Sequence, residues 1–517
     1  MARFLTPDEA ATLVEDGQTL AICGATALQH PEILSVALEK RYRETGSPRN
    51  LLLFFTAGQG DRKDYGMNHY AHEGMLRRVI GGHLNLCPKL GRMILDNTIE
   101  AYNLPQGVLM QLQRDIAAGR VGTVTHVGLK TFADPRVEGG RLNARTTENI
   151  VEVVTISGRE LLLYKSLPFD VCFLRGTTAD EKGNITMENE PMLLETTAMA
   201  MATKNSGGKV IVQVERVVKA GTLDARMVKI PHIYVDTVVQ VTPEENRLLN
   251  DPLQYAAFSG EIKVPASSLP PLPLDERKIV ARRAAMELTP GVVVNLGIGM
   301  PEGVAMVANE EGLSEAMTLT VEHGPIGGIP AGGLLFGGTT NAECILDTPS
   351  QFDFYSGGGL DMAFLGLGEA DEAGNINVSR MGDRLAGCGG FVDITQNAKR
   401  VFFLGTFTTK GLEMDFTGAG LRITREGQLK KFVKQVGQVT FSGEYARDAN
   451  QPVLYITERA VFALRPDGVH LVEVAPGIDI RRDILDQMDF APKIPQEPKL
   501  MDARIFKPEV MGLQRNP

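Results

Sequence analysis

The chain has 517 residues, of which 43% are hydrophobic and 22% are charged, and its formal net charge is −10. This length exceeds that of a usual domain, so we expect at least two hydrophobic cores. The acidic balance excludes the basic surface that binding to nucleic acid or to an anionic membrane requires. A small-molecule enzyme is therefore the expected class.

The cysteines argue against a disulfide framework and against a zinc site. They are five in number and scattered, and no C-x-x-C pair occurs among them. No apolar run is long enough to span a membrane, and the first residues are acidic where a secretory signal would be basic. We therefore predict a cytoplasmic protein without a metal site.

The first predicted elements are a helix, a strand and a second helix. Thr6, Pro7 and Glu9 fit the N-cap, N1 and N3 positions of a capping box. The apolar run TLAIC, residues 19–23, is typical of a buried strand, and Pro31 fits the first position of the next helix.

The same order of elements recurs after Asp275. The run VVVNL, residues 292–296, again predicts a buried strand, and Pro301 again fits the start of a helix. Gly17 and Gly291 each fit the end of the helix that precedes the strand. The order of elements therefore indicates an internal repeat.

A second match between the halves is tighter. FDVCFLRGTTADEKGNI and LDMAFLGLGEADEAGNI, which begin at Phe169 and Leu360, align without a gap. We predict two structurally related open α/β domains with largely parallel sheets, and ligands at the carboxyl ends of the strands between them. The expected domains are residues 1–262 and 276–517, joined by a proline-rich linker, residues 263–275.

Two glycine-rich loops follow predicted strands or precede predicted helices. NLGIGMPEG places Gly297, Ile298, Gly299 and Met300 where backbone amides can approach a phosphate or a thioester. A nicotinamide-dependent oxidoreductase is an alternative, but Glu302 occupies the third glycine position of its fingerprint and would repel a pyrophosphate.

The second loop, AGCGGFVDI, supplies Gly387, Gly389 and Gly390, followed by Asp393. Clustered glycines let successive amides converge on one oxygen atom. A purely structural strand-to-helix turn is equally compatible with this pattern.

Glu322 is the candidate nucleophile. TLTVEHGPIGGIPAGG leads a strand of alternating type, Thr318 to Val321, directly into Glu322, and the following loop is rich in glycine and poor in polar side chains. The corresponding point of the first half has Ala57 and Gly58, so the fold itself does not require an acid there.

Long motifs along the chain resemble those of family I CoA-transferases, most closely the single-chain propionate or acetate CoA-transferases and more distantly the 3-ketoacid CoA-transferases. The motifs are NHYAHEGMLRRVIGGH, EAYNLPQGVL, VGLKTFADPRVEGGRLN, TVEHGPIGGIPAGG, QFDFYSGGGLD, GCGGFVDIT and VLYITERAVFAL. The resemblance implies that Glu322 is the nucleophile, that Gln106 lies near the acyl group, and that Gly387 to Phe391, with Cys388, lie beside the thioester. It also implies coenzyme A as a substrate, no bound cofactor, and a homodimer or homotetramer.

The chemistry of CoA transfer suits this residue set. A carboxylate that attacks a thioester gives a mixed anhydride and a thiolate, and neither leaving group needs a proton at neutral pH. The amides of Gly389 and Gly390, or the side chain of Gln106, are the expected donors to the oxyanion. An acyl-CoA hydrolase on the same scaffold is the enzymatic alternative, and a ligand-sensing regulator is a remote one.

Other polar residues are predicted to have structural or peripheral roles. His72, His83 and His323 lack the spacing of metal ligands and fit polar packing or substrate contact. Glu188 and Glu190 fit a structural role at least as well as a ligand role. The basic stretch with Lys430, Lys431 and Lys434 fits a solvated strand edge better than a phosphate site.

Overall fold

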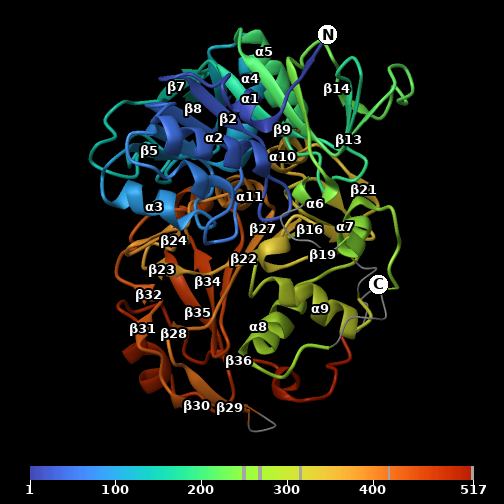
Figure 1. Ribbon diagram of the computed structural model, residues 1–517. Coiled ribbons are helices and arrows are strands. Elements are labelled where there is room, and N and C mark those ends of the chain that lie inside the picture. Colours follow the sequence, from blue (N-terminus) through green and yellow to red (C-terminus); the bar gives the residue numbers. More distant parts are fainter. Residues whose placement is uncertain (247–251, 266–270, 314–316, 417–419, 514–517) are drawn as a thin grey trace. The chain divides into compact units, whose positions relative to one another are not determined.

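The computed structural model describes residues 1–246, 252–265, 271–313, 317–416 and 420–513. The chain forms two compact units (Figure 1). Unit 1 comprises residues 1–264, 321–353 and 383–393, and unit 2 comprises residues 265–320, 354–382 and 394–517. The first change of unit falls in the proline-rich segment, of which residues 266–270 lie outside the described residues.

The units are not the contiguous halves 1–262 and 276–517 that the sequence suggests. Two segments from the second half, residues 321–353 with Glu322 and residues 383–393 with the second glycine loop, belong to unit 1. Both segments are hydrogen-bonded to loops that follow strands of the first half. The amide of Ala27 donates to the carbonyl of Leu334 (3.2 Å), and the amide of Leu84 donates to the carbonyl of Ala386 (2.7 Å).

An all-parallel sheet forms the centre of unit 1. All its neighbouring strands pair in parallel. Such a sheet is buried on both faces, and the apolar runs LLLFF and VCFLR in its middle are fully buried. In spatial order the strands are β1 (Arg3–Phe4), β15 (Thr237–Gln240), β12 (Lys209–Val214), β9 (Val171–Arg175), β2 (Thr19–Ile22), β3 (Leu51–Phe55), β4 (Leu76–Gly81) and β5 (Glu100–Asn103).

Helices cover this sheet. One hydrophobic cluster joins alternate strand residues, such as Leu20 and Leu53, to α1 (Pro7–Ala11), α2 (Glu32–Thr45) and α3 (Pro88–Leu95). Side chains alternate between the faces of a strand, so the remaining strand residues face the other side. There α4 (Gln106–Ala117) packs against α5 (Thr196–Asn205), and α5 contacts β9 and β12.

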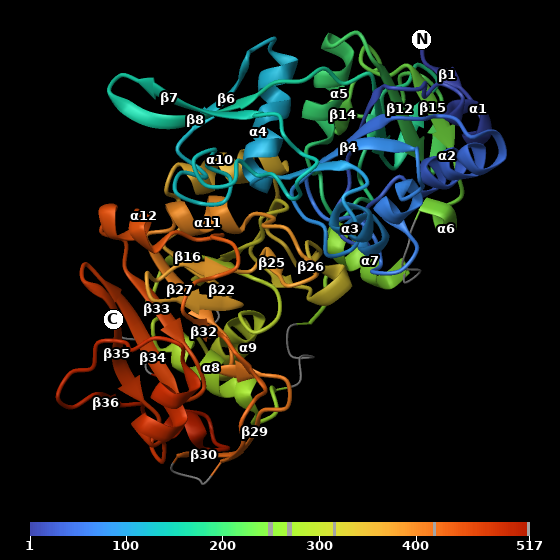
Figure 2. The ribbon, with the colours of Figure 1, turned by 90° about the vertical axis from the view of Figure 1, so that its left-hand side faces the viewer.

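A separate antiparallel sheet extends from unit 1 as a long hairpin, seen clearly in Figure 2. Its strands are β6 (Gly122–Thr125), β8 (Arg159–Lys165) and β7 (Val151–Ile156), in that spatial order. Shorter elements of unit 1 are α6 (Pro243–Asn246) and α7 (Pro252–Ser259).

Unit 2 has its own mixed sheet. The strands β17 (Met317–Thr320), β16 (Val292–Leu296), β22 (Met362–Gly366), β27 (Arg400–Leu404) and β33 (Val453–Ile456) pair in parallel. An antiparallel meander continues it through β34 (Ala460–Arg465) and β35 (Gly468–Val474), and β36 (Lys499–Leu500) pairs in parallel at the edge. A core cluster joins this sheet to α8 (Glu276–Ala285) and α9 (Glu302–Glu310).

The gap-free sequence match corresponds to the same local structure in both units. β9 leads into the hairpin of β10 (Thr178–Asp180) and β11 (Ile185–Thr186), and β22 leads into that of β23 (Glu369–Asp371) and β24 (Ile376–Asn377). In each hairpin an aspartate, Asp180 or Asp371, accepts hydrogen bonds from turn amides and from the side chain of an asparagine four residues later. The alternating α/β class predicted from the sequence is confirmed.

The predicted element boundaries agree with the structure to within one residue at the prolines and differ at two glycines. The capping box of Thr6 and Glu9 is present, and Pro31 and Pro301 each lie one residue before a helix, as N-caps of α2 and α9. Gly17 does not end a helix, because α1 already ends at Ala11. It has a φ of 77° in the turn before β2, a left-handed conformation that glycine adopts without strain.

Gly291 shows the same difference, because α8 ends at Ala285 and Gly291 (φ 79°) belongs to the turn before β16. Both glycines therefore mark strand entry rather than helix exit. Within the described residues, no helix combines the length and the apolar character that a membrane crossing needs.

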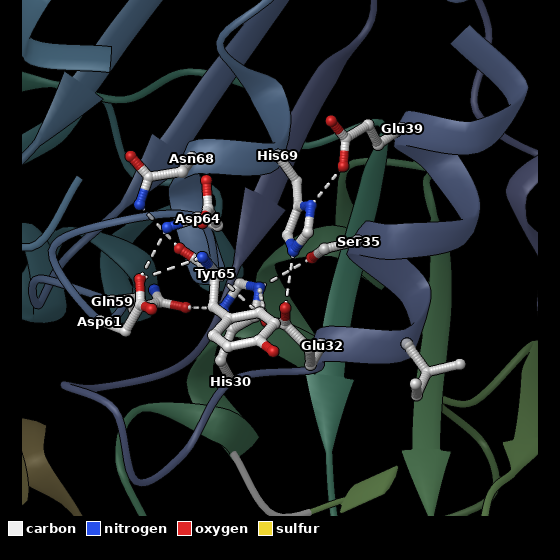
Figure 3. Close-up of polar contacts among 12 residues, drawn as sticks. His30, Glu32, Ser35, Glu39, Gln59, Asp61, Asp64, Tyr65, Asn68 and His69 are labelled. Carbon is white, nitrogen blue, oxygen red and sulfur yellow. Dashed lines mark hydrogen bonds and ion pairs between the residues drawn. The ribbon is translucent and has the colours of Figure 1, made fainter. Parts of the chain in front are cut away.

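A buried polar network joins α2 to the short helix η1 (Gly66–Tyr70) in unit 1 (Figure 3). The imidazole of His69 lies between two carboxylates, with Nε2 2.6 Å from Glu32 and Nδ1 2.5 Å from Glu39. Burial lowers the pKa of His69, but the hydrogen bonds and charges of these carboxylates outweigh it, so the net pKa is raised. The network therefore ties α2 to η1 through a histidine that lies between two carboxylates.

Candidate active site

Glu322 lies at the tip of a tight turn. The chain leaves β17 at Thr320, and the amide of Val321 donates to the carbonyl of Pro325 (2.9 Å), while the amide of Gly324 donates to the carbonyl of Val321 (2.9 Å). The turn is fixed by the antiparallel pairing of β18 (Pro325–Ile326) with β21 (Cys344–Ile345). Glu322 is thereby held at a defined position after a strand, as the sequence predicts.

The carboxylate of Glu322 is only partly accessible, and it accepts no hydrogen bond from the described residues. Burial raises its pKa to about 7. Loss of hydration is the cause, because a carboxylate that is removed from water without a compensating donor is destabilised in its charged form. A carboxylate with these properties is a stronger nucleophile than one held in an ion pair.

Gly390 borders Glu322 closely. A Cβ atom added at Gly390 would lie 3.3 Å from Cδ of Glu322 and 2.9 Å from Cζ of Phe352. Any larger residue would therefore intrude on the carboxylate. This close approach gives a physical reason for glycine at this position of the loop.

The glycine loop is attached to the loops that follow β4 and β5. The amide of Leu84 donates to the carbonyl of Ala386 (2.7 Å), and the amide of Cys388 donates to Oδ1 of Asn103 (2.9 Å). The side chain of Asn103 in turn donates to the carbonyl of Gly82 (2.6 Å). These bonds hold residues 386–388 at the carboxyl edge of the unit 1 sheet.

One expectation for the oxyanion donors needs correction. The amide of Gly389 donates to the carbonyl of Gly82 (2.8 Å), so it is already engaged within the protein. The amide of Gly390 meets no acceptor among the described residues. Of the two predicted backbone donors, only Gly390 is available to a ligand in this conformation.

Gln106 is the first residue of α4 and lies beside this loop. Its amide donates to the carbonyl of Gly389 (2.9 Å), and its side chain is buried, with only 2% of its surface exposed. Its Oε1 is 3.6 Å from the position of a Cβ at Gly389, and its Nε2 has no partner among the described residues. A buried donor without an acceptor costs about 1–3 kcal/mol, so Gln106 is poised for a ligand oxygen.

Gly387, Cys388 and Phe391 complete the loop. Gly387 has a φ of 78°, and a Cβ there would lie 2.9 Å from both the carbonyl oxygen of Gly82 and Cα of His83, so only glycine fits. Cys388 and Phe391 are buried. Burial raises the pKa of the Cys388 thiol far above its usual value, and the charges of Asp393 and Glu322 add to this effect. The thiol is therefore not a nucleophile.

Two neutral histidines stand near the site. Burial lowers the pKa of the half-buried His83 to about 4 and that of His323 to about 3. Both ring nitrogens of His323 lack partners among the described residues, and its ring meets Phe336 edge-on with centroids 5.5 Å apart. No cluster of metal-binding side chains occurs within the part of the chain that the structure describes.

Comparison with known proteins shows the family to which the chain belongs. A sequence model described as "Coenzyme A transferase" matches residues 4–241. A caffeate CoA-transferase of Acetobacterium woodii is 46% identical over 519 residues, which cover 99% of both chains. The chain belongs to the coenzyme A transferase family. The predicted resemblance to family I CoA-transferases is thereby confirmed.

Further relatives support the assignment of this chain to the CoA-transferases. The acetate CoA-transferase YdiF of Escherichia coli K12 is 42% identical over 509 residues, covering 98% of this chain and 96% of the relative. A crystal structure of the E. coli O157:H7 acyl-CoA transferase YdiF as a thioester complex with CoA superposes with a TM-score of 0.93 at 40% identity, covering 99% and 98% of the two chains. The protein is an enzyme that transfers CoA from an acyl-CoA to a carboxylate.

The predicted site residues of this CoA-transferase fall into both units. Unit 1 brings together Glu322, Gln106 and the residues of the second glycine loop. The loop Gly297–Met300 belongs to unit 2, where it follows β16 and precedes α9. There the amide of Gly297 donates to the carbonyl of Phe364 (2.8 Å), and Gly299 has a left-handed φ of 87°.

Sequence reasoning missed Asn103 and Phe352, and it gave no role to Asp393. Asn103 lies three residues before Gln106, in the motif EAYNLPQGVL, so the motif itself was the available signal. Phe352 stands in the motif QFDFYSGGGLD, but its contact with Gly390 is a long-range one. No periodicity or spacing could have indicated that contact.

The residues set aside in the sequence mostly have partners within the protein. Glu190 forms a buried ion pair with Arg175 (Nε to Oε2, 3.0 Å), and Glu188 pairs with Arg216 (2.9 Å). Lys430 pairs with Asp489 (2.9 Å), and the exposed Lys434 pairs with Glu372. Burial lowers the pKa of Lys431 to about 8, which Glu458 partly offsets.

Proposed function

We propose that Glu322 is the nucleophile of this CoA-transferase and that CoA is carried on its side chain between two half-reactions. The observation that carries the proposal is the set of unengaged groups around it. The carboxylate of Glu322 accepts no hydrogen bond from the described residues, and the Gly390 amide and the Gln106 side-chain amide beside the same loop lack acceptors there. Such a set fits a substrate carbonyl that is attacked and polarised at once.

The first half-reaction has two displacements. A carboxylate oxygen of Glu322 attacks the thioester carbonyl of the donor, the C–S bond breaks, and CoA leaves as a thiolate from a mixed anhydride. The thiolate then attacks the Glu322 carbonyl of the anhydride, the C–O bond breaks, and the donor acid leaves as a carboxylate. Glu322 is now a CoA thioester. The acceptor carboxylate reverses both displacements and leaves as the new acyl-CoA.

Each displacement passes through an oxyanion. One preorganised donor to such an oxygen lowers the barrier by about 3 kcal/mol. Gly390 and Gln106 are the proposed donors. No step needs a proton donor. This agrees with the low pKa values of His83 and His323, because an imidazole that is neutral near pH 7 is not a proton donor of the imidazolium type.

For the substrates we propose short-chain acids, with acetate and propionate as donor or acceptor. An acetate CoA-transferase and a caffeate CoA-transferase are both close relatives, so family membership alone does not select the acid. One methylene in an apolar pocket changes discrimination by about 1–3 kcal/mol, and small differences in lining decide among such acids.

For CoA we propose two contact regions, the loop Gly297–Met300 in unit 2 and the residues Gly387, Cys388 and Phe391 in unit 1. The first region is a strand-to-helix loop with two glycines, where backbone amides can approach a ligand. Its Ile298 is 46% exposed, so an apolar part of the ligand can pack against it. The second is the loop that holds the Gly390 amide.

We further propose a cytoplasmic homo-oligomer, a dimer or a tetramer. All five cysteines are free thiols, which fits a reducing compartment. Light scattering on the purified protein tests the assembly, and a monomer would contradict it.

The central test is intact-protein mass spectrometry after mixing with acetyl-CoA or propionyl-CoA, with a borohydride-treated sample for peptide mapping. We expect a CoA-sized adduct, with reduction confined to the peptide that contains Glu322, and no adduct in Glu322→Ala. An adduct on another residue, or transfer by Glu322→Ala, would overturn the proposal. Thioester loss that does not depend on added acetate or propionate would favour the hydrolase alternative instead.

A further inference from the structure

Asp393 connects the glycine loop to the helix that carries Gln106. It lies in the first turn of α11 (Phe391–Asn397), and its side chain is completely buried. Its carboxylate accepts hydrogen bonds from the amides of Gly107 (3.2 Å) and Val108 (3.1 Å). Asp393 therefore caps α4 from a position 286 residues away from Gly107 in the chain.

The cap fills a need of α4. The first amides of a helix have no partner inside the helix, and the residue before it, Pro105, makes no side-chain cap. Three successive amides are instead bound by the segment 389–393: Gln106 donates to the carbonyl of Gly389, and the next two donate to Asp393. The first turn of α4 and the glycine loop are thus one hydrogen-bonded assembly.

Packing makes this assembly tight. A Cβ atom at Gly107 would lie 2.6 Å from Oδ1 of Asp393 and 2.4 Å from Cδ1 of Phe352. The same phenyl ring approaches Gly390 with its Cζ atom. Phe352 therefore fills the space between the capped turn and Gly390, the glycine that borders Glu322. A shift of the turn would displace Phe352 and, through it, the glycine loop.

We propose that Asp393 is a positioning residue for CoA transfer, which caps α4 so that the Gln106 side-chain amide is held where the reacting carbonyl oxygen forms. The inference rests on the proposed function, because Gln106 matters only if it polarises that carbonyl. Asp393 itself does not touch the reacting atoms. Its role is to remove the freedom of the first turn of α4, so that the Gln106 donor needs no rearrangement during the reaction.

A double-mutant cycle on the single-turnover rate of CoA adduct formation tests this inference. With acetyl-CoA, we expect Gln106→Ala and Asp393→Ala each to slow adduct formation by about 100-fold. The double variant should be no more than about threefold slower than Gln106→Ala alone, because Asp393 then has no donor left to position. Asp393→Asn, which keeps one acceptor oxygen, should recover part of the rate and serves if the alanine variant does not fold.

The control is Asp180→Ala. Asp180 is also buried in unit 1 and accepts from three turn amides, those of Lys182, Gly183 and Asn184, but it contacts no residue of the site. Its loss should lower the melting temperature, leave the rate within about twofold, and combine multiplicatively with Gln106→Ala.

Three results would overturn the inference. They are a Gln106→Ala protein with the wild-type rate, an Asp393→Ala protein with the wild-type rate, and a double variant slowed by the full product of the single effects. None of these requires transfer by Glu322→Ala. Failure of the positioning role is therefore distinguishable from failure of the proposed nucleophile.

Discussion

A Cβ atom at Gly390 would lie only 3.3 Å from Cδ of Glu322. Real Cβ atoms rarely approach other atoms so closely, and the position is also 2.9 Å from Phe352, so neither neighbour can remain in place. Gly390→Ala should therefore displace the carboxylate by a fraction of an ångström.

The expected result for Gly390→Ala is a 10- to 100-fold slower formation of the CoA adduct, because about 1 Å of misplacement at a reacting group costs on the order of 100-fold. Single-turnover mass spectrometry measures it. Gly91→Ala in α3 is the matched control, since a Cβ there meets no atom within 4 Å. An unchanged rate in Gly390→Ala would mean that the carboxylate reacts from another position.

The pH dependence of the first half-reaction follows from the pKa of Glu322. Because burial raises this pKa to about 7, the nucleophilic carboxylate form is lost as the pH falls through 7. Adduct formation should slow by about tenfold per pH unit below 6.5 and level off above 7.5. A rate that is flat down to pH 5 would contradict the raised pKa.

The neighbouring acid affects how this profile is interpreted. Burial also raises the pKa of Asp393 to about 8, and the charge of Glu322 contributes to that shift. Burial and the charge of Asp393 raise the pKa values of the Cys388 thiol and the Tyr164 phenol, so both groups remain protonated throughout this range. The two carboxyl groups titrate as a coupled pair, so the single step that Asp393→Asn retains would belong to Glu322.

As the pH rises, the ionisation of Glu322 should increase activity but decrease the stability of the folded protein. Its folded-state pKa is raised, so the folded protein loses stability relative to the unfolded chain as the pH rises from about 4.5 through 7. Glu322→Gln should therefore be more stable than wild type by about 3 kcal/mol at pH 8, and nearly equally stable at pH 4.5. Urea unfolding at both pH values measures this. A variant that is less stable at pH 8 would show that the carboxylate has stabilising partners in the folded protein.

The sequence predicted the strands and helices that precede the site, because local patterns determine them. The capping box at Thr6 and the run VVVNL depend on neighbouring residues alone, and the structure has both. The division into units was beyond such patterns. Segments 321–353 and 383–393 join unit 1 through contacts between residues hundreds of positions apart, such as Cys388 to Asn103.

The site was predicted only in part, again because some of its features depend on contacts between residues that are far apart in the sequence. Long motifs identified Glu322, Gln106 and the glycine loop, but they could not tell which amide of the loop is free. That depends on Gly82, whose carbonyl engages the Gly389 amide and leaves the Gly390 amide without an acceptor among the described residues. Contacts between loops that follow different strands, such as this one, produce no periodic pattern in the sequence.

The network around His69 gives a pH-dependent contribution to the stability of unit 1. The imidazole bridges Glu32 and Glu39 (Figure 3). Glu39 also binds His72 (2.8 Å). His69→Gln leaves two largely buried carboxylates without this cation. At pH 6 the loss should be about 3 kcal/mol, because breaking a buried ion pair leaves an uncompensated charge.

The sign of its pH dependence follows from the raised pKa of His69. A raised folded-state pKa contributes stability that is complete below the unfolded pKa of about 6.5 and is lost as the pH rises through the folded value. The difference between wild type and His69→Gln should therefore be larger at pH 6 than at pH 9 when measured by urea unfolding. His72→Gln, which removes a more exposed partner of Glu39, should cost less at pH 6. An equal loss for His69→Gln at both pH values would mean that the imidazole acts through packing rather than through its charge.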